Sequence, residues 1–340
     1  MAANPTLKEK VFITGANGFI GSNLCGYFLA RGYEVYGLVR RTSDLHFLEG
    51  LPVKIVYGDL RDPQSFELPE DFDYLIHAAA VVSDMASESE CELGTYGTTV
   101  NLVRKVLDKR TRPKRFVYIS STLVLGYIGT NLSEENPGRP ADFIPYVRAK
   151  KRVESFLLEK MKSDRLPLVI LRPGDTYGPN DRTTCARVMK SADRGVPVIV
   201  GHGRHRFASC YIDNLCQVVE LTFKNDLAVG KAYTVTNGIV PSWREFFSGL
   251  QRGIGKKQRL YVPVWAGKLL AFSQQAWKKI SPGFQPEVSQ YRIRRITTET
   301  TYDISRTVAE LGYRPDNDTE KQIQAIVDWY LEEKKKGNIK

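Results

Sequence analysis

Histidine, cysteine and long apolar runs are scarce in this chain of 340 residues. It has four histidines and five cysteines, and the cysteines are odd in number and widely spaced. This usage argues against a disulfide framework and favours a reducing compartment. No apolar run is long enough to cross a membrane, and residues 1–10 lack the apolar core of a secretory signal. We therefore expect a cytoplasmic protein.

Acidic residues are outnumbered, with 38 Asp and Glu against 49 Lys and Arg, so the formal net charge is +11. A basic surface attracts phosphate, but no nucleic-acid recognition motif accompanies the charge, and we expect no nucleic-acid partner. A solvated basic surface, an anionic membrane surface and an anionic ligand stay open as explanations. The basic residues gather at Lys256, Lys257 and Arg259, at Lys278 and Lys279, at Arg292, Arg294 and Arg295, and at Lys334 to Lys336.

The histidines offer no metal site. His202 and His205 are three residues apart, but no acid or cysteine nearby completes a ligand set. We expect no bound metal.

Short apolar runs alternate with helical patterns in the first half of the chain, as in repeated βαβ units. Such runs form parallel sheets that are covered on both faces, and crossover handedness favours a doubly wound α/β layout. A late strand at Ala232–Val235 is expected to return to the same sheet. The other predicted strands are Val11–Thr14, Glu34–Val39, Val53–Val56, Tyr74–His77, Phe116–Ser120 and Leu168–Leu171.

A glycine turn follows the first predicted strand and opens a helix. Its glycines allow a tight turn, close approach of the backbone to a pyrophosphate, and close packing of helix on strand. The helix N-terminus adds unpaired N–H groups and a positive dipole. We predict a Rossmann-type dinucleotide site contacted by Gly15, Asn17, Gly18, Phe19, Ile20 and Gly21.

The residue after the second strand indicates which cofactor binds. An acid there usually binds the ribose 2′-OH of NAD, whereas this chain has Arg40, which can pair bidentately with a 2′-phosphate. Stacking of Arg40 on the adenine is the alternative. We predict a preference for NADP(H), with NAD(H) as the alternative cofactor.

Two more strand ends are predicted to border the cofactor. Ala78, Ala79 and Ala80 follow the fourth strand, and such small side chains let the cofactor lie against the backbone. Asp59 and Leu60 follow the third strand. Asp59 either accepts the adenine amino group or caps a turn.

A Tyr–Lys pair begins a later predicted helix. Tyr146 and Lys150 are four residues apart and therefore lie on one helical face. A neighbouring ammonium favours the phenolate, so Tyr146 can exchange a proton with a substrate hydroxyl. Ser121, after the apolar run of the fifth strand, is predicted to hydrogen-bond the same oxygen. The order of glycine turn, serine, tyrosine and lysine along the chain supports this catalytic set.

Together these residues resemble the extended short-chain dehydrogenase/reductase superfamily, the NAD-dependent epimerase/dehydratase family, over essentially the whole chain. The resemblance implies an oxidoreductase that forms a homodimer, with Tyr146 and Lys150 at the nicotinamide ribose and Pro173 beside the nicotinamide. It also places the catalytic hydroxyl at Ser121 in preference to Ser120. The matching segments are Thr14–Gly21, Asp59, Ala78–Ala79, Ser120–Gly126, Tyr146 with Lys150, and Leu171–Gly178.

One position departs from the family pattern. Gly94 precedes Gly97 and Thr98 where many relatives carry an asparagine. This departure puts in doubt any proton relay through that side chain.

The residues after Ser121 distinguish between reactions. Sugar-nucleotide 4,6-dehydratases resemble one another in an Asp–Glu pair there, whereas this chain has Thr122 and Leu123. Arg40 favours an exchanging cofactor over the tightly held NAD of epimerases. The stretches 201–203, 210–214 and 230–238 resemble the 3β-hydroxysteroid dehydrogenase and dihydroflavonol-reductase-like branch. We therefore expect interconversion of a secondary alcohol and a ketone on a hydrophobic, steroid- or lipid-like small molecule.

Two alternatives stay open for the function: an NDP-sugar epimerase or reductase, and a non-catalytic nucleotide-binding scaffold. Arg206 fits either a nucleotide diphosphate or a structural anchor. The segment Val262–Ile280, aromatic and edged by lysines, fits a lid, a contact with a membrane surface, or plain core packing.

Two interleaved domains are expected, because the pattern changes after Arg172–Pro173 while the strand at 232–235 returns to the first domain. We assign residues 8–175 and about 208–238 to the Rossmann domain. Residues from about 176 to 207 and 239 to 330 form the smaller substrate domain. Residues 1–7 and 331–340 are expected to be flexible tails.

Overall fold

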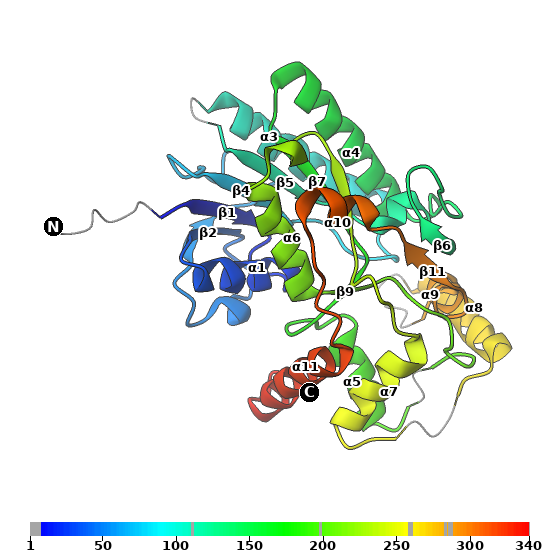
Figure 1. Ribbon diagram of the computed structural model, residues 1–340. Coiled ribbons are helices and arrows are strands. Elements are labelled where there is room, and N and C mark those ends of the chain that lie inside the picture. Colours follow the sequence, from blue (N-terminus) through cyan, green and yellow to red (C-terminus); the bar gives the residue numbers. More distant parts are fainter. Residues whose placement is uncertain are drawn as a thin grey trace.

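Seven parallel strands form the central sheet of the computed structural model, in the order β10-β7-β5-β4-β1-β2-β3 (Figure 1). The described residues are 8–109, 112–196, 199–257, 261–281, 284 and 288–339. The strands are β1 (Lys10–Thr14), β2 (Glu34–Val39), β3 (Lys54–Tyr57), β4 (Tyr74–His77), β5 (Arg115–Ile119), β7 (Leu168–Pro173) and β10 (Ala232–Val235). This order confirms the doubly wound α/β prediction, including the return of β10 to the sheet.

Helices cover both faces of this sheet because successive strand residues point to opposite sides. In β1, Val11 and Ile13 pack in the layer that holds α1 (Phe19–Ala30) and α6 (Ile212–Phe223). Phe12, between them, packs in the opposite layer with α3 (Thr98–Asp108) and α4 (Pro145–Asp164). Each strand packs against an apolar layer on both faces of the sheet, so its sequence is an uninterrupted apolar run.

Smaller elements lie beyond the carboxyl ends of the strands. Two short parallel sheets pair β8 (Asp175–Tyr177) with β9 (Ser209–Tyr211) and β6 (Gly129–Leu132) with β11 (Thr300–Tyr302). Figure 1 shows α5, α7 and α11 grouped below the sheet, and α8 with α9 at one edge of the molecule. The remaining helices are α2 (Glu88–Cys91), α5 (Cys185–Asp193), α7 (Trp243–Gly253), α8 (Val264–Ile280), α9 (Gln290–Ile296), α10 (Ser305–Leu311) and α11 (Thr319–Lys335).

The C-terminal part differs from the expected domain plan in two places. Helix α10 packs on β10 and α6 of the main sheet, and Thr307 Oγ1 donates to the Thr234 carbonyl at 2.6 Å. Residues 331–335 continue α11 and are not a flexible tail, because Lys334 pairs with Asp193 at 2.6 Å. Ile339 is also buried. Residues 1–7, Arg259 and residue 340 lie outside the described residues.

The segment around α8 is not core. Only Gly267 and Ala271 of its described residues are buried, whereas Trp265, Leu269 and Phe272 are exposed. The core-packing alternative is therefore wrong for most of this helix. Among the described residues, no helix has the length and apolar character needed to cross a bilayer.

Candidate active site

The glycine turn between β1 and α1 is packed so closely that side chains do not fit. Gly15 has φ +69°, and a Cβ there would lie 2.9 Å from the Ala79 Cα. A Cβ on Gly21 would lie 2.1 Å from the Gly15 carbonyl oxygen. Gly18 donates its N–H to that same oxygen at 3.0 Å and caps α1. The turn thus brings the backbone of β1, α1 and β4 to one point.

The N-terminus of α1 is available to an anion. In this described helix, the cap residue Gly18 provides no side-chain hydrogen bond, and the first turn holds no acid. Phe19 and Ile20 begin the helix and are half-buried, while Asn17 Nδ2 donates to the Asp44 carbonyl at 3.2 Å. Free N–H groups and the helix dipole suit the pyrophosphate of a dinucleotide. A close-packed glycine cradle with an open helix end is the geometry that a nicotinamide dinucleotide requires.

Arg40 lies immediately after β2 and is exposed. Within the described part of the chain its guanidinium has no hydrogen-bond partner, although its charge helps to lower the pKa of Asp59. Its neighbour Arg41 instead lies over the Tyr57 ring at 5.4 Å. Among the described residues at this strand end, Arg40 is therefore a cation without a hydrogen-bond partner.

Asp59 caps a turn after β3. Its carboxylate accepts from the Arg61 backbone N–H at 2.9 Å and from the Arg61 guanidinium at 2.6 Å. These contacts hold the pKa of Asp59 below its usual range. The side chain of Leu60 is buried in the core, and its carbonyl accepts from Asn101 at 2.9 Å. The structure shows the turn-capping role of Asp59, and the adenine contacts of both residues stay predictions.

Ala78, Ala79 and Ala80 are half-buried after β4, next to the glycine turn. His77, the last residue of β4, holds this strand end in place. Its ring bridges Thr14 Oγ1 at 2.7 Å and Thr99 Oγ1 at 2.9 Å, which ties β4 to β1 and α3. Complete burial lowers the pKa of His77 to about 3, so the ring is neutral. It is a structural histidine that links three elements.

The structure brings the three predicted catalytic residues together. Ser121 lies two residues after β5 and caps a short helical turn, Thr122–Leu125, where its Oγ accepts from the Leu123 N–H at 3.2 Å. Tyr146 is the second residue of α4, which begins at Pro145. Burial raises the pKa of Tyr146 to about 12, and a hydrogen bond with Ser121 acts in the opposite direction. The serine and tyrosine side chains are therefore close neighbours.

Lys150 lies one turn further along α4 and is buried. Its Nζ lies 5.8 Å from the Tyr146 ring centroid and 4.6 Å from that of Tyr118. It donates to the Ile119 carbonyl of β5 at 2.7 Å, which fixes the side chain across the sheet end. Burial lowers the pKa of Lys150 to about 7, and the nearby Glu154 carboxylate raises it.

Glu154 is a buried acid that the sequence analysis missed. It accepts from Ser120 Oγ at 2.5 Å and from two nitrogens of Arg172, at 2.6 and 3.1 Å. Ser120, the residue after β5, is thus committed to this network, which leaves Ser121 as the serine next to Tyr146. The signal was present, because Tyr146, Lys150 and Glu154 recur at four-residue intervals on one face of α4.

Gly94 lies in a π-helical turn, Glu92–Gly97, ahead of α3. A Cβ at Gly94 would lie 2.5 Å from Val81 Cγ2. A side chain at this position would require Val81 to shift, and glycine itself has no group that could carry a proton, so the doubt about that relay stays.

Two remaining residues border the strand ends. Pro173 ends β7 and is buried. Arg206 uses its backbone to join neighbouring segments: its N–H donates to Glu299 at 2.9 Å and its carbonyl accepts from Thr300 at 3.2 Å. Its side chain is exposed, so both alternatives for Arg206 stay open.

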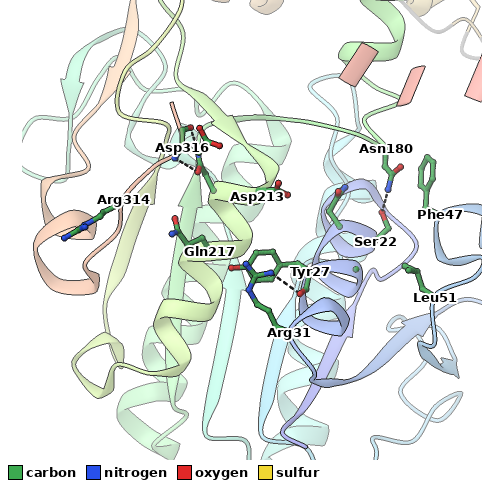
Figure 2. Close-up of a pocket in the computed structure, with 13 residues that line it drawn as sticks. Ser22, Tyr27, Arg31, Phe47, Leu51, Asn180, Asp213, Gln217, Arg314 and Asp316 are labelled. Carbon is green, nitrogen blue, oxygen red and sulfur yellow. Dashed lines mark hydrogen bonds between the residues drawn. The ribbon is translucent and has the colours of Figure 1, made fainter. Parts of the chain in front are cut away.

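A cavity of about 550 Å³ lies between α1 and α6 (Figure 2). No predicted site residue is among its described lining residues. Arg31, on its wall, stacks on Tyr27 at 3.4 Å and pairs with Glu220. The cavity is separate from the cluster formed by Ser121, Tyr146 and Lys150. The lining residues are Ser22, Asn23, Gly26, Tyr27, Arg31, Phe47, Leu51, Asn180, Asp213, Asn214, Gln217, Arg314 and Asp316.

Comparisons with known proteins agree with this geometry. UDP-glucose 4-epimerase of Vibrio cholerae is 27% identical over 96% of this chain and 97% of its own length. The 3 beta-hydroxysteroid dehydrogenase/Delta 5-->4-isomerase of Mycobacterium tuberculosis is 25% identical over 95% of this chain and 90% of its own. The structure of UDP-glucuronic acid 4-epimerase from Bacillus cereus in complex with NAD has a TM-score of 0.74 at 22% identity, covering 96% and 98% of the two chains.

The two sequence relatives act on different substrate classes, so the similarity shows the enzyme type and not the substrate. Residues 11–236 match the model of the NAD dependent epimerase/dehydratase family. The expected resemblance is confirmed, and with it a nicotinamide-dependent enzyme. This chain belongs to the NAD dependent epimerase/dehydratase family.

Proposed function

We propose that the protein is an NADP-dependent oxidoreductase that interconverts a secondary alcohol and a ketone on a hydrophobic, steroid- or lipid-like substrate. The observation that carries the proposal is the grouping of Ser121, Tyr146 and Lys150 at the carboxyl end of the sheet, where Ser121 is close enough to lower the pKa of Tyr146 and Lys150 is buried beside them. A protein that only binds nucleotide has no need of this arrangement.

Each residue has a distinct part in the proposed reaction. A nicotinamide held at this site would supply or accept the hydride at the substrate carbon. Because the pKa of Tyr146 is about 12, its hydroxyl holds a proton that it can donate to a ketone oxygen during reduction. Ser121 hydrogen-bonds the same oxygen and orients it. Charged Lys150 stabilises the resulting phenolate, and the Ile119 carbonyl keeps its Nζ in place.

Apolar neighbours of Tyr146 support a hydrophobic substrate. Tyr146 and the half-buried side chains of Leu123, Ile128 and Tyr291 all pack against one buried apolar cluster, which consists of Tyr127, Ala141, Ile144 and Val147. Phe143 and Val82, on nearby segments, are 57% and 73% exposed. Thr122 and Leu123 stand where an acid would be needed for dehydration. The steroid dehydrogenase relative from Mycobacterium tuberculosis acts, by its name, on a substrate of this class.

Arg40 supports NADP as the cofactor. Its guanidinium is exposed and unpaired among the described residues at the end of β2, where the ribose of a dinucleotide lies in this fold. A 2′-phosphate would give this cation a bidentate partner.

Substrate class is tested by turnover with both cofactors. NADPH or NADH would be mixed with a panel of sterol and long-chain ketones, and NADPH oxidation followed by absorbance. Reduction of a sterol ketone with NADPH, lowered by about a hundredfold or more in Tyr146→Phe with cofactor affinity unchanged, is the expected result. Epimerisation of a uridine-diphosphate sugar without ketone reduction would replace this proposal with an epimerase.

The cofactor is tested with two neighbouring arginines. In Arg40→Ala the affinity for NADPH should fall by about tenfold to a hundredfold, because two charge-assisted hydrogen bonds are lost, while NADH affinity stays nearly constant. Arg41→Ala removes an equal charge from the Tyr57 ring and is the matched control. Equal losses in the two variants would show a general charge effect and refute the specific role of Arg40.

A further inference from the structure

Helix α8 is attached to the molecule along one narrow face. Gly267 and Ala271 are its buried residues, and a Cβ on Gly267 would lie 3.1 Å from Ile293 of α9. Gln274 and Lys278 continue this face: Gln274 accepts from the Val288 N–H at 3.0 Å, and Lys278 Nζ donates to the Met85 carbonyl at 3.0 Å. Small side chains at the contact let the helix lie close against its support.

The opposite face of α8 is apolar and open. Trp265, Leu269, Phe272 and Ile280 are 71%, 62%, 65% and 76% exposed. Together with Ala276 they recur at intervals of three or four residues, so they form one stripe along the outer side of the helix. Trp277 and Leu270 flank the stripe and are 56% and 47% exposed. A stripe of this length, with one tryptophan in it and a second beside it, is unusual on a surface that meets only water.

The chain segment that contains α8 carries charge of one sign, and the acids Asp84 and Glu90 lie at the inner side of the helix. Residues 246–286 contain no Asp or Glu, but they contain seven basic residues. Lys268, on α8 itself, is exposed beside the stripe. Pairing with a second copy would bring these like charges together, whereas an anionic surface would neutralise them. Tryptophan near both ends and basic flanks are the composition of helices that lie in a lipid interface.

We propose that α8 docks the protein on an anionic lipid surface, with the helix parallel to the surface and the stripe of Trp265, Leu269, Phe272 and Ile280 inserted among the lipids. α8 lies at one edge of the molecule (Figure 1), so a flat surface can approach it. Because α8 is not long and apolar enough to cross a bilayer, it binds reversibly at the membrane interface.

Contacts at the inner face connect the docked helix to the candidate active site. Lys278 binds the Met85 carbonyl, and on α9 Arg292 pairs with Asp84 at 2.7 Å. Both partners belong to the loop that follows β4 and Ala78–Ala80. This loop therefore connects the lipid-facing helix with the end of β4, which is predicted to border the cofactor. If the proposed function holds, on which this step alone rests, a lipid-like substrate reaches the site from the surface on which the protein is docked.

Vesicle binding tests the proposal without any turnover. The full chain would be mixed with phosphatidylcholine vesicles with and without phosphatidylglycerol, and binding followed by co-sedimentation. Trp265 and Trp277 are two of the four tryptophans, so their insertion should shift the emission to shorter wavelength. We expect binding to the phosphatidylglycerol vesicles that weakens with added salt, and at least about tenfold weaker binding to phosphatidylcholine alone.

The matched variants separate the stripe from general surface hydrophobicity. Trp265→Ser/Leu269→Ser/Phe272→Ser should weaken vesicle binding by about a hundredfold or more, because three inserted side chains are lost. Because these side chains are exposed, the fold should persist, which circular dichroism checks. Leu227→Ser/Leu331→Ser removes apolar side chains that are 69% and 44% exposed elsewhere, and binding should be unchanged.

Two results would overturn the proposal. One is equal vesicle binding by the native chain and the triple variant. The other is absence of binding of the native chain to the phosphatidylglycerol vesicles; a dimer that the triple variant dissociates would then assign the stripe to a second copy. The variant Tyr146→Phe should bind vesicles as the native chain does, so failure of the proposed reaction and failure of lipid docking are measured separately.

Discussion

Replacing Glu154 with Gln tests whether this buried carboxylate sets the charge of Lys150. The two residues are one turn apart on α4, where side chains are about 6 Å apart. At that distance and an effective dielectric constant of about 20, two unit charges interact by about 3 kcal/mol, or about 2 pKa units. Arg172 shares the carboxylate and offsets part of this interaction. We therefore expect the pKa of Lys150 to fall by about 1 unit from its present value near 7 in Glu154→Gln.

The direction of the shift decides its effect on activity. Lys150 carries its charge only below its pKa, so a lower pKa removes the ammonium at neutral pH. The alkaline limb of the pH profile of kcat/KM should move to lower pH by the same amount. The pKa itself is measured without substrate, from the Cε resonance of lysine labelled with carbon-13 as the pH is raised.

Two further variants make the result interpretable. Glu154→Gln leaves Arg172 without its buried partner, which costs about 3–5 kcal/mol of stability, so the titration is limited to pH values at which the variant is folded. Glu154→Gln/Arg172→Gln removes both charges and should return the pKa of Lys150 toward its native value. Ser120→Ala removes a neutral contact of Glu154 and should leave it unchanged. A Lys150 pKa that is the same in folded Glu154→Gln and in the native protein would refute the reasoning.

Two more predictions concern the glycine turn and the buried histidine. Gly15→Ala should weaken binding of both NADPH and NADH by more than about tenfold, because its methyl group would meet the Ala79 backbone at 2.9 Å. Gly32→Ala, also at positive φ but facing open space, is the control, and equal losses of affinity in isothermal titration would contradict the packing argument. The pKa of His77 is lowered to about 3 in the folded state, whereas the unfolded chain has the usual value of about 6.5. Between these two pH values the unfolded chain binds the proton more readily, so the free energy of unfolding falls as the pH is lowered through this window. From pH 6.5 to 5, urea unfolding should show a loss of about 2 kcal/mol that is absent in His77→Asn, and parallel pH dependences in the two proteins would be incompatible with a neutral His77.

The strands of the main sheet were predictable because each one serves two hydrophobic layers. Tyr74–His77 and Ala232–Val235 have the predicted bounds, and β1 begins one residue earlier than expected. An apolar run of four to six residues between turn signals has few other solutions in a βαβ pattern. The glycine turn was predictable for the same kind of reason, since only glycine fits where three backbones meet.

The surroundings of the candidate site were less accessible to sequence reasoning. Glu154 sits in an otherwise charged stretch of α4, and nothing in the composition shows that this acid is buried while Lys151 beside it is not. The environment depends on Arg172, which arrives from β7, eighteen residues later. Helix α8 shows the reverse problem: its apolar residues resembled core in sequence, but no described part of the chain covers their outer side.

The late arrival of β10 has a consequence for synthesis on the ribosome. β7 ends at Pro173, but its outer neighbour begins only at Ala232, so one edge of a buried parallel sheet has no partner while the intervening chain is made. Helix α10, which covers β10, is made later still. Unpaired parallel edges are where nascent chains associate with one another. A nascent chain stalled between β7 and β10 should therefore need chaperones more than one that is released just beyond α10.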